Sequence, residues 1–330
     1  DEKGLKMSKS LGNTIVPAEV VQQYGADILR LWVAQTDYTA DHRIGPEILK
    51  GVADSYRRLR NTFRFILGNL AGFTEGERVS RDEMPELERW VLHRLAELDG
   101  EVRAGYAAYD FQGVFQQLFN YCTIDLSTLY FAIRKDALYC DAATSLHRRA
   151  ARTVLEALFE RLTRWLAPML VFTMEEVWLS RKPGEAASVH LEDFASVPGD
   201  WLDADLAAKW VKVRAVRRVV TGALEIERRE KRIGASLETA PVIHVQDPEL
   251  RGMLDGLPFA DLCITSDLTV TDAAAPEGAF TLPDVPGVAV VPRPANGTKC
   301  ARCWKILPDV GTHAHPGVCG RCIAALTVAL

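Results

Sequence analysis

Residues 46–70 read PEILKGVADSYRRLRNTFRFILGNL, and this stretch predicts a long amphipathic helix. Its apolar residues recur at spacings of three and four, the period of a helix face that packs on a core. They are Ile48, Leu49, Val52, Tyr56, Leu59, Phe63, Ile66, Leu67 and Leu70. Pro46 suits the first turn of a helix, where its missing N–H would have no partner in any case. The stretch therefore favours a helical fold.

Similar helical patterns lie on both sides of this stretch. Further helices are predicted to start, in chain order, at Pro17, Pro85, Asp110, Ser145 and Thr173. Gly25 is expected to interrupt the first of them, and Asp110 is expected to cap its helix through the side chain. Thr173 with Glu176 forms a capping-box pattern. Because the loops between these helices are short, an antiparallel bundle is the predicted architecture.

The pattern changes in the last third of the chain. One more long helix is predicted over 203–232. After Gly234 the sequence becomes rich in Val, Ile and Thr with alternating polarity, which is typical of short strands. The predicted strands are PVIHVQ (241–246), DLCITSDLTVTD (261–272) and GVAVVPRP (287–294). A small α/β region is therefore expected to follow the bundle.

The composition is that of an ordinary globular protein. Of the 330 residues, 48% are hydrophobic and 25% are charged. No apolar run of about eighteen residues occurs, so we expect no transmembrane helix and no membrane partner. The first residues, DEKGLKMSKS, lack the apolar core of a signal peptide, which favours a cytoplasmic protein. They also lack an initial Met and read as a loop, which favours a piece of a longer protein.

Four of the seven cysteines form two CxxC pairs near the end of the chain. Cys300, Cys303, Cys319 and Cys322 have the spacing C-x2-C-x15-C-x2-C, which fits a tetrahedral zinc site. Four protein ligands leave no position for water, so the predicted zinc ion is structural. A redox dithiol is the alternative, although one CxxC pair would suffice for that chemistry.

Residues around these cysteines have predictions of their own. The basic side chains of Arg302, Lys305 and Arg321 could offset the negative charge of a zinc tetrathiolate. His313 and His315 lie in the intervening loop; they are alternative ligands in principle but are expected to be exposed loop residues. Trp304 either covers the metal site or contacts a partner. The remaining cysteines are expected to be small buried residues, and they are Cys122, Cys140 and Cys263.

A second motif, KMSKS followed by LGN, lies at the start of the chain. Its lysine ammonium groups are mobile point charges that suit a polyphosphate, and such groups stabilise charge that develops in adenylyl transfer. A solvated lysine-rich loop is the simpler interpretation. The motif resembles the second signature of class I aminoacyl-tRNA synthetases, in which this loop closes over ATP. The resemblance implies ATP contacts by Lys6, Met7, Ser8, Lys9 and Ser10, with Lys6 and Lys9 as catalytic residues.

Other stretches narrow this resemblance to the isoleucyl-tRNA synthetases. They are residues 26–41, 60–70, 188–191, 233–238 and the CARCW motif at 300–304. The resemblance covers most of residues 4–240 and returns at the cysteines. It implies a cytoplasmic, monomeric enzyme that activates isoleucine with ATP and Mg²⁺ and attaches it to tRNA-Ile. It also implies that the zinc element supports contact with tRNA.

The upstream parts of such an enzyme are missing from this sequence. Class I synthetases carry a His-x-Gly-His element for ATP, and none occurs here. The inserted editing domain would also lie upstream. The chain alone is therefore expected to bind rather than catalyse. Two alternatives remain, a fragment of a valyl-type synthetase and a stand-alone zinc-ribbon module that binds tRNA.

Basic residues cluster on the predicted helices although the net charge is −5. A basic stripe along a helix is typical of proteins that follow a phosphate backbone. The candidate tRNA contacts are Arg57, Arg60, Arg64, Arg214, Arg218 and Arg229. The alternative is a solvated, salt-bridged face, because Glu225, Glu227 and Glu230 are interleaved with the last of them.

The predicted fold is mainly α: an antiparallel helical anticodon-binding bundle, then a small α/β region and a C-terminal zinc ribbon. Four parts are expected along the chain. They are the KMSKS loop with a connecting segment (1–45), the helical bundle (46–198), a long helix with a small α/β junction (199–295) and the four-cysteine element (296–330).

Overall fold

The computed structural model describes residues 1–184 and 186–327, which form two compact units. Unit 1 consists of residues 1–81, 91–130 and 152–202, and unit 2 consists of residues 82–90, 131–151 and the described chain from 203 onward. Helices dominate the chain, which confirms the predicted mainly α fold. Among the described residues, no helix is long and apolar enough to cross a bilayer.

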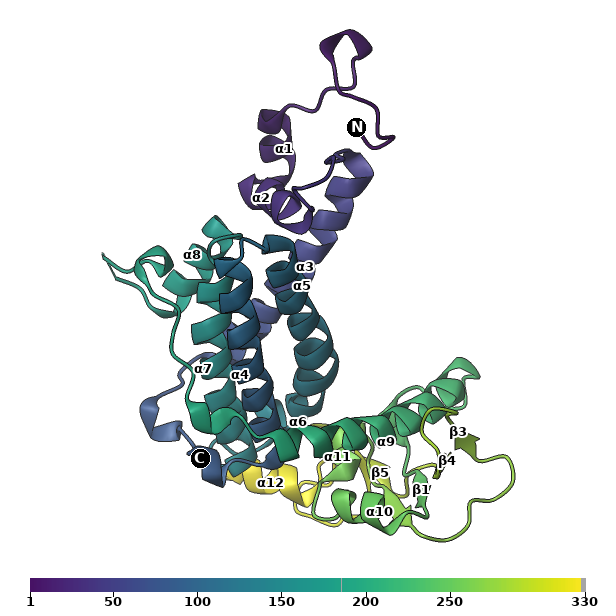
Figure 1. The fold of residues 1–330 in the computed structure, drawn as a ribbon. Coiled ribbons are helices and arrows are strands. Elements are labelled where there is room, and N and C mark those ends of the chain that lie inside the picture. The colour runs from purple at the N-terminus through teal and green to yellow at the C-terminus, as the bar shows by residue number, and fades with distance from the viewer. Residues whose placement is uncertain (185, 328–330) are drawn as a thin grey trace. The chain divides into compact units, whose positions relative to one another are not determined.

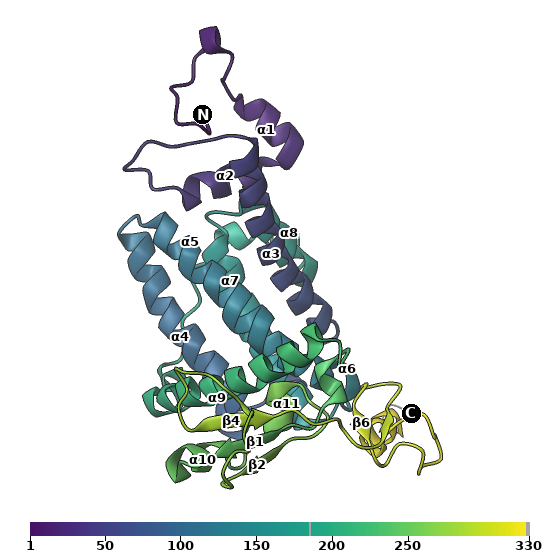
Figure 2. The same ribbon diagram turned by 90° about the vertical axis from the view of Figure 1, so that its right-hand side faces the viewer.

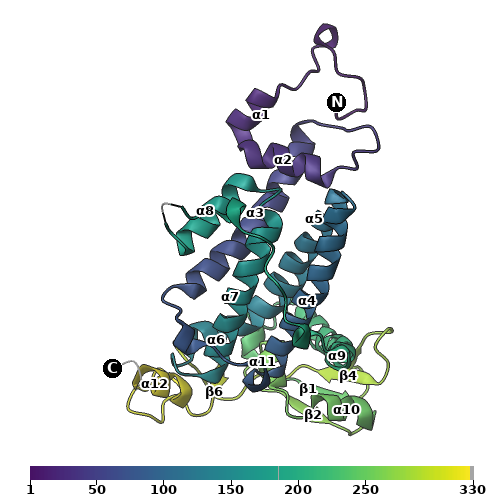
Figure 3. The same cartoon turned by 60° about the vertical axis from the view of Figure 1, so that its left-hand side comes forward.

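Unit 1 is a helical bundle. Its helices are α1 (Pro17–Tyr24), α2 (Ala26–Gln35), α3 (Pro46–Leu70), α5 (Phe111–Asn120) and α8 (Val171–Arg181), with parts of α4 (Glu86–Ala107) and α7 (Leu146–Leu166). The predicted apolar stripe of α3 is buried, as Leu59, Phe63 and Ile66 show. α2 lies across one end of the bundle and contacts α3, α5 and α8 (Figure 1). In the same unit, residues 1–16 form a loop that extends beyond α1 (Figure 3).

Local sequence signals set several helix boundaries as predicted. Pro17 and Pro46 occupy the first turns of α1 and α3. Gly25 separates α1 from α2 with a φ of 89°, a conformation that favours glycine. The Asp110 carboxylate accepts the N–H of Gly113 at 2.8 Å, so this residue caps α5.

The predicted capping box at Thr173 is wrong. α8 begins two residues earlier, at Val171, and Thr173 lies inside its first turn. The carboxylate of Asp27, on α2, accepts the N–H of Phe172 at 3.3 Å and the N–H of Thr173 at 2.7 Å. It also accepts the Thr173 hydroxyl at 2.6 Å. No residue just before α8 supplies a side-chain acceptor for its first-turn amides. Asp27, on a helix far away in the sequence, caps them instead.

The helical run predicted to start at Asp110 contains a π-helical segment. This segment, Tyr121–Phe131, connects α5 to α6 (Ala132–Cys140) without a break in the helical run. The Thr128 hydroxyl donates to the Thr123 carbonyl at 2.8 Å, five residues back, within this wider turn. Apolar spacing does not distinguish a π-helix from an α-helix over one or two turns, so the sequence offered no signal for it.

Unit 2 combines helices with a small sheet. Its strands are β1 (Val242–Val245), β2 (Thr269–Thr271), β3 (Phe280–Thr281) and β4 (Val288–Val291), in the order β2-β1-β4-β3. β1 pairs parallel with β2 and antiparallel with β4. Its helices include α6, α9 (Ala204–Arg229), α10 (Pro248–Leu254) and α11 (Phe259–Cys263). α9 packs against β3 and β4, and Figure 2 shows it beside β4. Asp203 caps this helix, which begins where the long helix was predicted to start.

The strand predicted over 261–272 is wrong in its first half. Residues up to Cys263 belong to α11, and Ile264 ends that helix in the left-handed region with a φ of 57°. The strand itself is only β2. Leu262 and Cys263 are buried in α11, which packs against α9 and α6. Tertiary contacts therefore override the strand preference of this short apolar run.

A buried ion pair joins α4 to α6 within unit 2. Arg134 Nε and Nη2 donate to the two carboxylate oxygens of Glu88, each at 2.5 Å. The two side chains are only 4% and 0% exposed. Replacing Glu88 by glutamine would remove the carboxylate to which two donors of the buried guanidinium are bonded. We therefore expect Glu88→Gln to lower the free energy of unfolding in urea by about 3–5 kcal/mol.

A matched substitution separates this effect from a general loss of charge. Glu47→Gln removes one partner of the exposed Lys50–Glu47 pair, whose side chains are 70% and 78% exposed. That change should lower the free energy of unfolding by less than about 1 kcal/mol. Replacing both buried partners, as Glu88→Leu with Arg134→Met, should recover most of the lost stability. Equal urea midpoints for Glu88→Gln and Glu47→Gln would contradict the burial argument.

Candidate nucleotide-contacting loop and zinc centre

The KMSKS segment folds into a compact turn in unit 1. Its last residues form a short 3₁₀ helix, Lys9–Leu11, which Ser8 caps by accepting the Leu11 N–H at 3.3 Å. Gly12 ends this helix in the left-handed region with a φ of 63°. The hydroxyls of Ser8 and Ser10 lie 3.1 Å apart. The two serines therefore hold the turn in shape from within the motif.

Asn13 closes the turn from the other side. Its side-chain oxygen accepts the N–H of Ser8 at 2.9 Å. Its amide nitrogen donates to the Lys6 carbonyl at 3.3 Å and to the Asp1 carboxylate at 2.9 Å. The Asn13 side chain therefore ties both ends of the motif together.

The lysines of this turn face solvent. Lys6 and Lys9 are exposed, and so is Met7. Two ammonium groups on a turn whose backbone is already ordered can approach a polyphosphate without a large loss of backbone entropy. Positive charge held where negative charge develops in a transition state is among the strongest catalytic contributions. The loop therefore has the geometry and charge of a polyphosphate contact.

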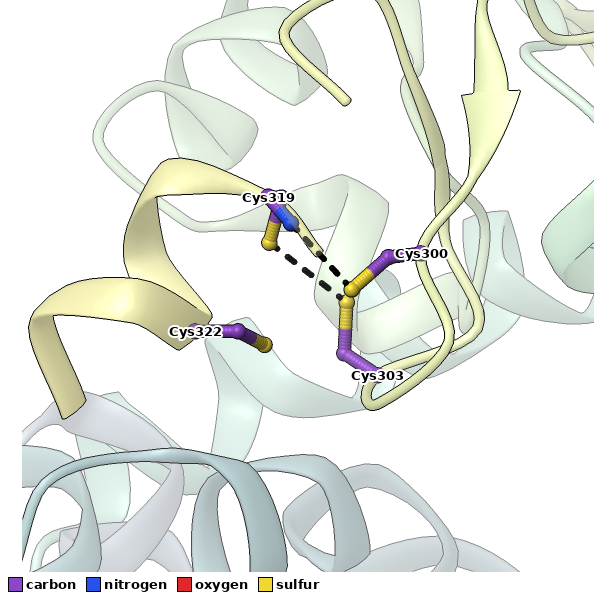
Figure 4. Close-up of side chains that lie close together, drawn as sticks. All are labelled: Cys300, Cys303, Cys319 and Cys322. Carbon is purple, nitrogen blue, oxygen red and sulfur yellow. Dashed lines mark hydrogen bonds between the residues drawn. The ribbon is translucent and has the colours of Figure 1, made fainter. Parts of the chain in front are cut away.

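The four predicted cysteines come together in unit 2. Cys300 and Cys303 lie on the turn between β5 (Thr298–Lys299) and β6 (Ile306–Leu307). Cys319 and Cys322 lie at the start of α12 (Gly320–Thr327). All four side chains are buried, and their sulfurs lie within 4.8 Å of one another. Figure 4 shows the two pairs facing each other across a small space.

The cluster fits a zinc ion. With a zinc–sulfur bond of about 2.3 Å, the sulfurs of a tetrahedral site lie about 3.8 Å apart. The sulfurs of Cys303 and Cys319 are 3.8 Å apart. The N–H of Cys319 donates to the Cys300 sulfur at 3.4 Å. Burial opposes ionisation of this thiol, but donation from the amides of Cys303, Cys319 and Arg302 lowers the pKa of Cys300 to about 6, whereas burial raises the pKa of Cys303 to about 11.

The residues between the cysteines attach this element to α6. Arg321 donates to both carboxylate oxygens of Asp136, at 2.5 and 2.9 Å, and to Asp141 at 3.1 Å. Arg302 donates to the carbonyl of Tyr139 at 3.0 Å and to the carbonyl of Cys140. Each CxxC pair therefore contributes one arginine to a contact with the same end of α6.

These contacts give four residues roles that sequence reasoning missed. The arginines were expected to offset the charge of the metal, and they also dock the element on α6. Lys305 lies 2.5 Å from the carboxylate of Asp261. Cys140 is buried, as expected, and it also packs against the cysteine pairs, with its sulfur 3.6 Å from the Arg302 carbonyl. His313 and His315 are exposed and lie outside the cluster, as expected.

A cavity of about 520 Å³ opens beside the zinc element in unit 2. Its walls include Tyr139 of α6, Asp261 of α11, and Arg302 and Trp304 of the zinc turn. The backbone of Trp304 is in the left-handed region, with a φ of 65°. The residue is 60% exposed, so its ring faces solvent. The Lys299 ammonium lies 5.8 Å from the centre of this ring. Exposed aromatic faces beside positive charge are the features that bind unpaired nucleic-acid bases.

The six predicted tRNA-contacting arginines are distributed over both units. Arg57, Arg60 and Arg64 are exposed on α3 in unit 1. The other three lie on α9 in unit 2, and two of them have intramolecular contacts. Arg214 lies over the Trp90 ring at 5.2 Å, and Arg218 donates to the Asp284 carboxylate at 2.5 Å.

Three families of known proteins match consecutive parts of the chain. "tRNA synthetases class I (I, L, M and V)" matches residues 1–45, and "Anticodon-binding domain of tRNA ligase" matches residues 88–244. "Zinc finger found in FPG and IleRS" matches residues 297–325. Among solved structures, a ternary complex of Agrobacterium radiobacter K84 LeuRS with tRNA and LeuAMS matches 62% of this chain and 23% of that chain, at 21% identity and a TM-score of 0.49.

Curated relatives extend over nearly the whole sequence. The isoleucine–tRNA ligase of Ruegeria pomeroyi is 68% identical over 99% of this chain and 34% of the relative. That of Brucella abortus is 57% identical over 99% of this chain and 33% of the relative. The chain thus spans about a third of the length of the curated relatives it matches. The three family matches and these identities make the chain similar, over nearly its whole length, to one third of an isoleucine–tRNA ligase.

Proposed function

We propose that this chain is the C-terminal third of an isoleucine–tRNA ligase. The intact enzyme would activate isoleucine with ATP and Mg²⁺ and attach it to tRNA-Ile, as a cytoplasmic monomer. This part would supply the ATP-contacting loop, the surface that binds tRNA and a structural zinc ion. The proposal rests on the relatives, of which that of Ruegeria pomeroyi is 68% identical over 99% of this chain, and on the chemistry of the loop and the zinc element.

The four parts predicted along the chain would divide this work. Residues 1–45 would contact ATP through Lys6, Met7, Ser8, Lys9 and Ser10, and 46–198 would form the anticodon-side bundle. Residues 199–295 would join the bundle to the zinc element at 296–330. Arg60, Arg64 and Arg229 are exposed and would be available to phosphates, whereas Arg57, Arg214 and Arg218 already have partners within the chain.

The exposed ring of Trp304 beside the cavity carries the tRNA-binding part of the proposal. Anticodon bases are unpaired, and proteins bind such bases by stacking them on aromatic rings. The Lys299 ammonium near the ring would attract the neighbouring phosphates, and Arg302 lines the cavity beside it. We therefore propose that Trp304 stacks on an unpaired base of tRNA-Ile, and that the zinc ion acts by holding the turn in place.

Trp304→Ala tests this stacking contact. Stacking on an aromatic side chain contributes about 1–3 kcal/mol per base, so binding of a tRNA-Ile transcript should weaken by about tenfold or more. Affinity should be measured at one fixed salt concentration, since phosphate contacts make it strongly salt-dependent. The preference for the natural anticodon over an altered one should fall in parallel.

Phe172→Ala supplies the matched control. Phe172 is 66% exposed, close to the value for Trp304, but it lies on α8 in unit 1. Its loss should leave tRNA affinity and anticodon preference unchanged. If Trp304→Ala and Phe172→Ala bind tRNA-Ile as tightly as the unaltered chain, the stacking contact does not exist.

A further inference from the structure

The chain just before the KMSKS motif is attached to the first turn of α3 by the side chain of Glu2. Oε1 of Glu2 accepts the N–H of Glu47 at 2.6 Å and the N–H of Ile48 at 3.2 Å. These amides belong to the first turn of α3, which has no intrahelical partner for them. A capping side chain normally comes from the residue that precedes the helix. Here that residue is Gly45, which has no side chain to offer.

Gly45 leaves the space that the Glu2 side chain occupies. A Cβ atom at Gly45 would lie 1.8 Å from Cγ and 2.2 Å from Cδ of Glu2, which is far too close for either to stay. The φ of Gly45 is −179°, an extended conformation open to any residue. Glycine is therefore needed at position 45 because a side chain would overlap Glu2, and not because of the backbone conformation. Any larger residue at 45 would displace Glu2 from α3.

A cavity and exposed apolar side chains surround the base of the loop. A cavity of about 410 Å³ separates it from the start of α3, lined by Glu2, Leu11, Asn13, Ile44 and Pro46 among others. The apolar side chains that flank the motif, Leu5 and Leu11, are 57% and 66% exposed. Apolar packing therefore contributes little to the position of the loop, and its polar attachment to α3 matters correspondingly more.

We propose that Glu2 and Gly45 form a latch that positions the KMSKS loop on the N-terminus of α3. The carboxylate both accepts two amide hydrogens and places negative charge at the positive end of a helix dipole. The latch thereby ties the loop that would contact ATP to the long helix of the bundle. Glu2 is therefore a positioning residue, because it acts on ATP only through the loop. This role rests on the proposed function, in which the loop contacts ATP.

Two substitutions remove the latch by different routes, and a third serves as control. In the full-length ligase, Glu2→Ala removes the acceptor, and Gly45→Ala expels Glu2 by steric conflict. Gly51→Ala changes a glycine of the same helix whose added Cβ would meet nothing within 4 Å. Isoleucine-dependent exchange of pyrophosphate into ATP measures activation, and hydrogen exchange at the amides of Glu47 and Ile48 measures the latch itself.

Both latch variants should raise the KM for ATP by about fivefold, the shift expected when a helix cap is lost. The KM for isoleucine and the affinity for tRNA-Ile should stay unchanged. The two amides should exchange faster in both variants but not in Gly51→Ala. Glu2→Gln keeps an oxygen acceptor without the charge, so it should restore part of the ATP affinity.

The two readouts separate failure of the latch from failure of the proposed function. If the two amides exchange faster while the KM for ATP matches that of Gly51→Ala, the contact exists but does not position the loop, and the proposal is overturned. If the amides exchange as in the unaltered protein, the latch is absent in solution. If Lys9→Ala also leaves activation unchanged, the assignment of the loop to ATP is the part that fails.

Discussion

Replacing Lys9 by alanine is expected to lower isoleucine-dependent pyrophosphate exchange by about 10²- to 10³-fold in the full-length ligase. The Lys9 ammonium is exposed on a turn that Ser8 and Asn13 hold in shape. Because the backbone is already ordered, the side chain can meet charge that develops on the phosphates as adenylyl transfer proceeds. The loss of one such preorganised contact typically lowers kcat by this amount.

The kinetic constants distinguish a transition-state contact from ordinary binding. A fall in kcat with little change in the KM for ATP would mean that Lys9 acts mainly in the transition state. Lys9→Arg should restore the activity only partly, because a planar guanidinium does not replace a compact ammonium. Lys3→Ala is the matched control, since Lys3 is also exposed and lies outside the motif. Equal activity of Lys3→Ala and Lys9→Ala would remove Lys9 from the catalytic machinery.

Much of the helical architecture follows from signals that are local in sequence. The boundaries of α3 and α5 depend on Pro46 and Asp110, each of which acts on its own helix. The apolar period of α3 similarly identifies the face that is buried. Such signals need no knowledge of the rest of the chain, so the sequence alone predicts them.

The errors in the sequence-based prediction concern contacts that cross long distances in the chain. Thr173 matches a capping-box pattern, yet the acceptor for its amide is Asp27, 146 residues away. The apolar run at 262–264 has the composition of a strand, yet packing of α11 on α6 and α9 makes its first residues helical. No pattern within a few residues can reveal either partner.

In the zinc element, too, features set by local spacing can be predicted, whereas contacts between distant residues cannot. The spacing of the four cysteines predicts their convergence, because two CxxC turns can surround a single ion. The attachment of this element to α6 could not be predicted, since Arg321 and Asp136 are 185 residues apart. For the arginines of α9, the spacing predicts more exposed positive charge than the structure has. Their spacing predicts a basic stripe, but the contact of Arg214 with Trp90 depends on which face of α9 packs on α4.

Removal of the zinc ion is expected to unfold residues 297–327 while the rest of unit 2 keeps its fold. The four-cysteine element has about thirty residues, too few to form a stable core without a metal or disulfides. The sheet of unit 2 has a separate core, in which Ile243, Val245 and Val290 are fully buried. Structural zinc sites contribute about 10–16 kcal/mol of binding free energy that is also folding free energy.

Cys319→Ser should therefore abolish stoichiometric zinc and expose the element. Metal analysis should find one zinc ion per unaltered chain and almost none in the variant. Amides of 297–327 should exchange rapidly in the variant, with only a small loss of helical circular dichroism. Because Trp304 would lose its support, affinity for tRNA-Ile should fall at least as far as in Trp304→Ala.

Cys140→Ala provides the matched control, since Cys140 packs against the cluster but is not one of its four converging sulfurs. This variant should keep its zinc and its tRNA affinity. Because protons compete with zinc for thiolates, a chelator should remove the metal faster as the pH falls. Full zinc content in Cys319→Ser, or loss of zinc in Cys140→Ala, would mean that the ligand set differs from the two CxxC pairs. Retained tRNA affinity after complete loss of zinc would mean instead that the element is not needed to bind tRNA.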